Sequence, residues 1–274
     1  MKIACLGIVK NEARYIAEWI AYQLAVGFDS VILFNHNSTD ATADEIGRFA
    51  DKYDVRLVDW TRTNRLYQIE AYEEGLRRYK SEFDWIAFFD TDEFLSLDDG
   101  LSLNDILPRG RNVAGLVIPW ANFGSSGHQT IQHGLVVENY CYRSEPGYKR
   151  NTHVKSIVRP KRIKSCVNPH YFQPLSRRRF ILGRPHPYKI VDLSGVQPAW
   201  EHPGIMAAAP IYRHAKLHHY FTKSAEDWAN KVARGHTDGN SYAAEEFVGF
   251  DRNEVFDDSA ARHADDVRKI LSRL

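Results

Sequence analysis

Residues 84–95 have the sequence DWIAFFDTDEFL, in which an apolar run ends in a group of carboxylates. The run from Trp85 to Phe89 is typical of a strand that is buried on both faces of a sheet. Asp90, Asp92 and Glu93 follow directly at its end. Like charges repel and a buried carboxylate is unfavourable, so packing alone does not account for their position.

Apolar runs before this stretch predict strands over residues 2–9, 30–35 and 55–60, with the fourth strand over residues 84–90. Helices are expected between them: one capped by Asn11 and ended by Gly27, one from Thr42 towards Lys52, and one over residues 68–80. This alternation indicates an α/β fold, a mostly parallel Rossmann-like sheet with right-handed crossovers and helices on both faces.

In such sheets ligands bind outside the carboxyl ends of the strands. The loops after Val9, Phe34 and Phe89 should therefore meet at one edge, which places the carboxylates of residues 90–93 at the functional edge of the sheet.

The second part of the chain has a different pattern. Short apolar segments at residues 114–120, 135–142, 153–159 and 188–193 predict an antiparallel extension, and two helices are expected at residues 224–235 and 259–274. We expect one domain over residues 1–274, made of a first half (1–100) and a second half that ends in C-terminal helices (101–274).

The composition excludes several classes of protein. The net charge of +1 over 274 residues gives no global field for nucleic acid. Three scattered cysteines predict neither a disulfide framework nor a thiolate zinc site. The first residues do not fit a signal peptide, and no apolar run has the roughly 20 residues of a membrane span. We expect a cytoplasmic protein, and peripheral membrane association stays open.

Asp90-Thr91-Asp92 can place two carboxylates on one divalent cation, because alternate residues of an extended turn point the same way. Such a cation would bridge the phosphates of a nucleoside diphosphate. The alternative is an exposed acidic turn.

Two further segments are polar at positions of interest. Residues 34–42, FNHNSTDAT, can contact a base or ribose, or can simply cap a helix. His218 and His219 end an apolar segment, and Ser224 can cap a helix whose start favours anions, near Lys223, Lys231 and Arg234. The alternative there is a solvated basic helix.

Five segments together resemble bacterial glycosyltransferases of the family-2-like and family-92-like group: GIVKNEARYIAEWIAYQLAVGFDSVILFNHNSTDAT, WIAFFDTDEF, WANFGSSG, KSIVRP and HYFTKSAEDWANKVARG. The resemblance covers Lys2 to about Gly235. It implies a GT-A fold, a nucleoside-diphosphate sugar as donor, with a UDP-sugar expected, and Mn²⁺ or Mg²⁺. The family's DxD motif falls on Asp90 and Asp92, and its late histidine on His219.

The expected metal ligands are therefore Asp90, Asp92 and His219. The residues expected to contact the nucleotide sugar are Lys10, Asn11, Glu12, Asn35, Asn37, Asp40, Gln68, Asp90, Lys223 and Ser224. His36 and Asn37 depart from the family-2 nucleoside motif at this loop.

The function expected is metal-dependent transfer of a hexosyl group to an acceptor hydroxyl in glycan or polysaccharide synthesis, with a carboxylate as base. Asp192 and Glu201 are the candidates for that base, and Trp120 with Phe123 are expected to offer flat faces to the acceptor. The alternatives are a nucleotidyltransferase, although no glycine-rich phosphate loop follows the first strand, and an inactive carbohydrate-binding relative, which leaves the Asp-x-Asp unexplained. A glycosidase is excluded, because its two carboxylates lie farther apart than neighbours in one turn.

Overall fold

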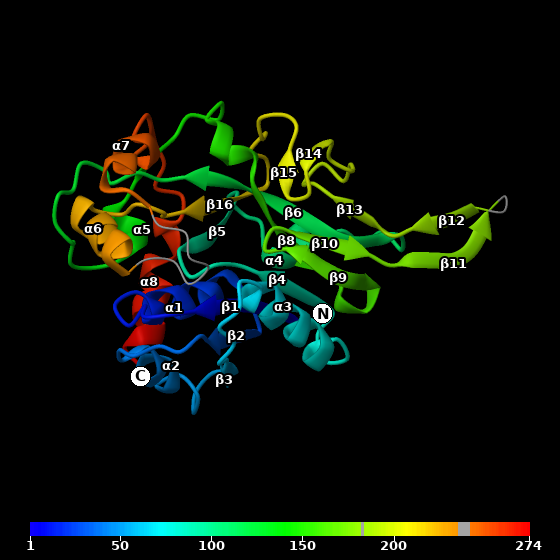
Figure 1. Ribbon diagram of the computed structural model, residues 1–274, viewed down its shortest axis with the longest axis horizontal. Helices are drawn as coiled ribbons and strands as arrows, with labels where there is room; N and C mark the ends of the chain where they lie inside the picture. The colour runs from blue at the N-terminus through cyan, green and yellow to red at the C-terminus, as the bar shows by residue number, and fades with distance from the viewer. Residues whose placement is uncertain (182–183, 235–241) are drawn as a thin grey trace.

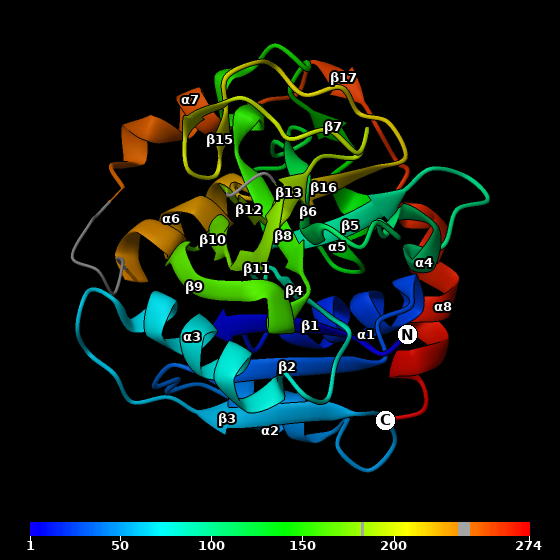
Figure 2. The same cartoon turned by 90° about the vertical axis from the view of Figure 1, so that its right-hand side faces the viewer.

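A twisted sheet runs through the molecule in the strand order β3-β2-β1-β4-β8-β6-β16-β5, with β13 beside β6 (Figures 1 and 2). This computed structural model describes residues 1–181, 184–234 and 242–274. β1 pairs in parallel with β2 and β4, and β2 with β3, as the alternating sequence predicts. β8 is antiparallel to both β4 and β6.

The strands of this sheet are β1 (Ile3–Val9), β2 (Ser30–Asn35), β3 (Val55–Asp59), β4 (Trp85–Phe88), β5 (Glu93–Leu97), β6 (Val113–Asn122), β8 (Val154–Val158), β13 (Lys189–Val191) and β16 (Ala215–His219). Shorter pairs are β7 (Tyr142–Arg143) with β17 (Val255–Phe256), β9 (Ile163–Asn168) with β10 (Tyr171–Pro174), β11 (Ser176–Ile181) with β12 (Arg184–Pro187), and β14 (Trp200–His202) with β15 (Ile205–Met206).

The α-helices are α1 (Ile16–Val26), α2 (Thr42–Gly47), α3 (Tyr67–Tyr79), α4 (Leu103–Ile106), α5 (Val136–Asn139), α6 (Ala225–Arg234), α7 (Phe247–Phe250) and α8 (Ala264–Leu271). Short 3-10 helices span Lys149–Thr152, Pro160–Arg162, Ala244–Glu246 and Ala261–His263.

The side chains of β1 alternate between two cores. Ile3 and Cys5 belong to the core that holds the buried residues of α1 and α8, whereas Ala4 and Leu6 belong to the core under α3. Figure 2 shows α3 and α1 on opposite faces of the sheet. The predicted fold class, a mostly parallel sheet between helices with an antiparallel extension, is confirmed.

Several predicted boundaries are wrong. α1 begins at Ile16 rather than next to Asn11, because the Asn11 side chain instead accepts a hydrogen bond from the backbone N–H of Thr39 at 2.7 Å. α2 ends at Gly47, and Thr42 forms no capping box; its Oγ1 accepts from the backbone N–H of Glu12 at 2.8 Å. Gly27 ends α1 as predicted, in the left-handed conformation with φ of 113°.

The sequence predicts a strand over residues 135–142, but Val136–Asn139 form α5 and only Tyr142 belongs to a strand, β7. The backbone N–H groups of Val136 and Val137 donate to the buried Glu18 carboxylate on α1, at 2.8 and 3.2 Å. A partner more than a hundred residues away thus fixes the local conformation. Similarly, the strand β5 exists because β16 pairs with it in antiparallel fashion.

Candidate active site

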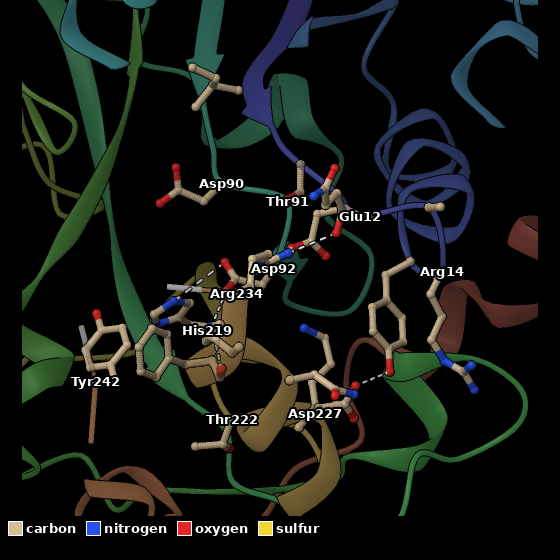
Figure 3. Close-up of a pocket in the computed structure, with 18 of the residues that line it drawn as sticks. Glu12, Arg14, Asp90, Thr91, Asp92, His219, Thr222, Asp227, Arg234 and Tyr242 are labelled. Atoms are coloured by element: carbon tan, nitrogen blue, oxygen red, sulfur yellow. Dashed lines mark hydrogen bonds and ion pairs between the residues drawn. The ribbon is translucent and has the colours of Figure 1, made fainter. Parts of the chain in front are cut away.

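A cleft of about 570 Å³ lies at the carboxyl ends of β1 and β4, where the first half of the chain faces α6 (Figure 3). The cleft therefore lies at the edge of the sheet where the sequence predicts ligand binding. Eight of the residues predicted to bind the donor or a metal line this cleft: Asn11, Glu12, Asp40, Gln68, Asp90, Asp92, His219 and Lys223.

Asp90 is held by groups of the protein itself. Its Oδ1 accepts hydrogen bonds from Gln68 at 2.9 Å and from Tyr72 at 3.2 Å, and its Oδ2 accepts from Lys155 at 2.7 Å. Lys155 comes from β8 and is fully buried. Both carboxylate oxygens of Asp90 are therefore already occupied.

Glu93 lies beneath the site and is fully buried. Its carboxylate accepts from the Trp120 indole at 2.7 Å and from the backbone N–H of Asp90 at 2.8 Å, and it lies 3.6 Å from Lys155. Burial raises the pKa of the Glu93 carboxyl well above its usual value, and Lys155 offsets part of that shift. Glu93 thus fixes the turn that carries Asp90 and Asp92.

Asp92 and His219 meet because of strand register. β16 pairs with β5 so that His219 lies opposite Glu93, and the backbone N–H of Tyr220 donates to the carbonyl of Asp92 at 2.9 Å. The Nε2 of His219 lies 3.7 Å from Asp92 Oδ1. Residues more than a hundred positions apart are thereby brought to one point (Figure 3).

The orientation of His219 is also fixed by pairing. β16 lies parallel to β6 with His219 opposite Asn122, and His219 Nδ1 lies 2.9 Å from the Asn122 side-chain oxygen. The Asn122 amide nitrogen donates to Asn151, so its oxygen accepts the Nδ1–H. The lone pair of Nε2 is left facing Asp92, and burial lowers the pKa of His219 to about 3.

A group of cations faces this pair from the second half. Lys231 lies 3.3 Å from Asp92 Oδ2, and Arg234 donates to Glu12 at 2.7 Å. Lys223 stands over the Tyr15 ring at 4.7 Å. Burial alone would raise the pKa of the Asp92 carboxyl, but the ammonium groups of Lys231 and Lys223 hold it well below its usual value. Asp92 is therefore a carboxylate at every physiological pH.

The start of α6 offers less than the sequence predicted. The backbone N–H groups of residues 224–227 donate to protein acceptors: Ser224 to Asp227, Ala225 to His128, Glu226 to Gln129 and Asp227 to Ser224. The prediction that free N–H groups at this helix start bind a diphosphate is therefore wrong. Ser224 is fully buried and caps the helix.

Residues 35–42 are hydrogen bonded mainly to the loop that follows β1. The backbone N–H of Asn11 donates to Ser38 at 3.1 Å, and that of Ala13 donates to Asp40 at 3.2 Å. His36 stacks on Tyr67, with ring centroids 4.3 Å apart, and Tyr67 lines the cleft. Asp40 lines the cleft, whereas Asn35 and Asn37 do not.

The remaining predicted residues lie elsewhere. Lys10 does not line the cleft, but its carbonyl accepts from Arg234 at 3.2 Å. Asp192 accepts hydrogen bonds from the backbone of Ser194 and Val196 in a turn after β13. Glu201 is exposed and lies 3.9 Å from Lys149. The structure does not bring Asp192 or Glu201 to the cleft. Neither residue therefore lies where a catalytic base would act.

The two aromatic side chains expected to stack on an acceptor are packed against histidines, and of the two only Trp120 lines the cleft. Trp120 lies between His153, with centroids 5.1 Å apart, and His219, at 4.0 Å. Phe123 is fully buried against His218. The predicted stacking role is wrong for Phe123, because the protein covers its ring, and it stays a prediction for Trp120.

His170 also lines the cleft, and it is not among the site residues that the sequence predicts. Its Nδ1 lies 3.0 Å from the carbonyl of Val154, which fixes the proton on Nδ1 and the lone pair on Nε2. A Cβ at Gly204 would lie 2.4 Å from the Cβ of His170, so only glycine fits behind it. Burial, assisted by Lys155, lowers the pKa of His170 to about 3 and keeps the ring neutral.

Lys155 and His170 carried weak sequence signals. A lysine within the apolar strand VKSIV is unusual, and this is the signal that could have marked Lys155. His170 stands between Pro169 and Tyr171 with no motif around it. Arg14, Tyr15 and Asp227 also line the cleft.

The donor set partly fits a divalent cation. Across residues 1–181, 184–234 and 242–274, no cluster of three or more His, Cys, Asp or Glu side chains is arranged to hold a metal. Asp92 and His219 form a pair of suitable ligands, with the second nitrogen of the imidazole held by Asn122. Oxygen atoms of a diphosphate would have to complete the coordination.

Residues 3–182 match the model of glycosyltransferase family 92. The chain belongs to this family. The resemblance seen in the sequence is thus confirmed for its family-92 part. The second half of the cleft, from His219 onward, lies beyond the matched residues.

Family 92 proteins of plants are among the relatives. The chain is 29% identical over 170 residues to one from Ricinus communis, covering 58% of this chain and 29% of the relative. It is 27% identical over 182 residues to one from Arabidopsis thaliana, covering 60% of this chain and 30% of the relative. The chain therefore spans less than a third of the length of these relatives.

Solved structures resemble the chain more distantly. TarS of S. aureus in complex with UDP-GlcNAc has a TM-score of 0.39 and 16% identity, covering 58% of this chain and 46% of the other. Glucosyl-3-phosphoglycerate synthase of Mycobacterium tuberculosis, in complex with Mn²⁺, UDP and glucosyl-3-phosphoglycerate, has a TM-score of 0.31 and 18% identity, covering 43% and 44%. Among the helices described, none has the length and apolar character needed to cross a bilayer.

Proposed function

We propose that this chain transfers a sugar from a nucleoside-diphosphate donor, a UDP-sugar, to a hydroxyl group of a glycan or another acceptor. The observation that carries the proposal is the pair Asp92 and His219, set in the cleft with Lys223, Lys231 and Arg234 around it. Family membership supports the reaction type, and the complexes of the structural relatives with UDP or UDP-GlcNAc motivate the choice of donor.

Asp92 and His219 would hold Mn²⁺ or Mg²⁺, which when bound supplies charge neutralisation for the departing diphosphate. Asp90 is a poorer ligand, because Gln68, Tyr72 and Lys155 already occupy its oxygens. Its proposed task is to fix the turn, and Gln68 shares that task.

The cations of α6 would bind the diphosphate. A nucleoside diphosphate carries about two to three negative charges, and the carboxylates of the first half repel them. Lys231 and Arg234 now pair with Asp92 and Glu12 across the cleft, so the phosphates would exchange those ion pairs for charge-assisted hydrogen bonds.

His170 would bind the acceptor. The Nε2 lone pair of a neutral, rigidly held imidazole accepts a hydrogen bond from a sugar hydroxyl at any pH above about 4. Each carboxylate that lines the cleft has a partner already, such as Arg234 for Glu12 and Tyr15 for Asp227. The hydrogen bond to His170 Nε2 would orient an acceptor hydroxyl towards the sugar held near Asp92.

The test is hydrolysis and transfer with UDP-, GDP- and dTDP-sugars, with Mn²⁺ and after chelation. We expect turnover of a UDP-sugar that needs the divalent cation and is lost in Asp92→Asn. The matched control is Asp192→Asn, which also removes one predicted carboxylate but lies outside the cleft. Equal activity of the Asp92→Asn and wild-type proteins would refute the proposal.

A further inference from the structure

Residues 159–191 are strongly basic, and we call them the basic arm. They contain nine lysines and arginines and no aspartate or glutamate, in a chain whose net charge is only +1. The other 241 residues therefore carry a net negative charge. Such an asymmetry concentrates a positive field on one part of the surface.

Where the side chains of the arm are described, no carboxylate compensates their charge. Five of its cations have described side chains, and none of these forms an ion pair with any residue the structure describes. The exposed ones are Lys161, Lys164 and Lys189, and the other two, Arg159 and Arg162, are half-buried. Elsewhere, surface cations such as Arg56 and Arg77 pair with carboxylates. The arm is thus positioned for an anionic partner outside the chain.

The remaining four cations lie on a projecting hairpin. β11 and β12 pair with each other and, among the described strands, with no other. Figure 1 shows this hairpin extending from the body at the end of the long axis opposite α6, and Figure 2 shows it directed along that axis. Arg177, Arg178 and Arg179 precede Phe180 and Ile181, the last residues of β11. Cations therefore flank an apolar end.

We propose that the basic arm docks the protein on a membrane surface containing anionic phospholipids. Each basic residue near such a surface contributes favourable attraction to the headgroups, and an apolar end favours insertion at the interface. The nearby cations on β9 and β13 widen the contact beyond the hairpin.

A nucleic acid is the less favoured partner. The rest of the chain is net negative and repels an extended polyanion, whereas a membrane meets only the projecting side. α6, which contributes to the cleft, lies at the opposite end of the molecule from the β11–β12 hairpin, so docking through the hairpin leaves the cleft accessible.

The test is co-sedimentation of the protein with vesicles of phosphatidylcholine alone and of phosphatidylcholine with phosphatidylserine. We expect binding only to the anionic vesicles, and release near 1 M salt, where the Debye length is about 3 Å. The variant Arg177→Glu/Arg178→Glu/Arg179→Glu should bind at least about a hundredfold more weakly, at roughly fivefold per cation.

The matched control is Arg268→Glu/Lys269→Glu/Arg273→Glu, which makes the same charge change with exposed residues near the C-terminus. It should bind as the wild-type protein does, and both variants should turn over a free donor normally. If the arm variant does not fold, the three Arg→Gln changes replace it. Equal binding to neutral vesicles, equal loss in the control, or tighter binding of single-stranded RNA than of anionic vesicles would each overturn the proposal.

Discussion

The two walls of the cleft are built differently. The wall from residues 8–92 is acidic, and Asp40 and Asp90 in it are held by neighbours on the same side, Asp40 by Thr42 and Asp90 by Gln68. The wall from residues 219–234 is cationic, and Lys231 and Arg234 reach across to carboxylates of the first wall. Part of the acidic wall is thus held by its own side, whereas the two cations of the second wall are held by carboxylates of the first.

This contrast has a functional consequence. Cations that pair across a cleft can exchange a carboxylate for a phosphate, because both are anions with similar donor requirements. A change in the acidic wall should therefore affect both folding and chemistry, whereas a change in the cationic wall should mainly affect donor binding.

Asp92→Asn should have the largest effect. It removes the carboxylate that Lys231 and His219 share, and we expect transfer to fall at least about a thousandfold, or about 4 kcal/mol in transition-state stabilisation. Repulsion within the Asp-x-Asp would predict a more stable variant. The structure predicts a lower melting temperature, because the half-buried Lys231 loses its carboxylate partner. A stabilised variant would show that the two walls do not pair in solution.

Lys155→Met tests whether the acidic wall depends on the cation buried beneath it. It leaves Asp90 and Glu93 without the buried cation between them, and we expect a loss of about 3–5 kcal/mol in the free energy of unfolding. Urea denaturation measures it. Lys161→Met, at an exposed position, serves as control and should stay within about 0.5 kcal/mol of wild type. Equal stabilities would mean that the acidic wall needs no internal counter-ion.

Glu18, on α1, joins the two halves of the chain through hydrogen bonds to the backbone of α5. Burial raises its pKa from 4.5 to about 7, despite the backbone N–H groups of Val136 and Val137 that it accepts from. The folded state therefore retains a proton that the unfolded chain releases, and the free energy of unfolding should fall by about 3 kcal/mol as pH rises from 4.5 to 7. Denaturation across this range should show no such slope for Glu18→Gln. An unchanged slope would assign the pH dependence to another group.

Lys231→Ala and Arg234→Ala should each weaken UDP binding about tenfold, or about 1.4 kcal/mol, with little change in the acceptor KM. The reason is that both cations are proposed to exchange their carboxylates for phosphates. Titration calorimetry measures the affinity, with Lys269→Ala as the control far from the cleft. Loss of stability without loss of affinity would make the cationic wall purely structural.

Asp192→Asn and Glu201→Gln should have the smallest effects. Neither residue lines the cleft, and we expect turnover to stay within about twofold of wild type. A large fall in kcat for either variant, with unchanged folding, would place a base there after all and require the second half to move.

The sequence predicted the first half well and the second half poorly, for a physical reason. Buried parallel strands leave continuous apolar runs, so β1, β2 and β4 could be located. The pairing of His219 with Asn122 depends on strand register across 97 positions, and that of Lys155 with Asp90 on contacts across 65. No local pattern records such partners, and the same holds for α5, whose conformation depends on Glu18.

The central claim, that a divalent cation joins the donor diphosphate to Asp92 and His219, is tested most directly by titrating UDP into the protein with Mn²⁺ and with chelator. We predict binding that needs Mn²⁺ and that His219→Ala weakens at least about tenfold, because the imidazole Nε2 is lost as a ligand. Equal UDP affinity with and without Mn²⁺, or wild-type affinity in His219→Ala, would contradict the account.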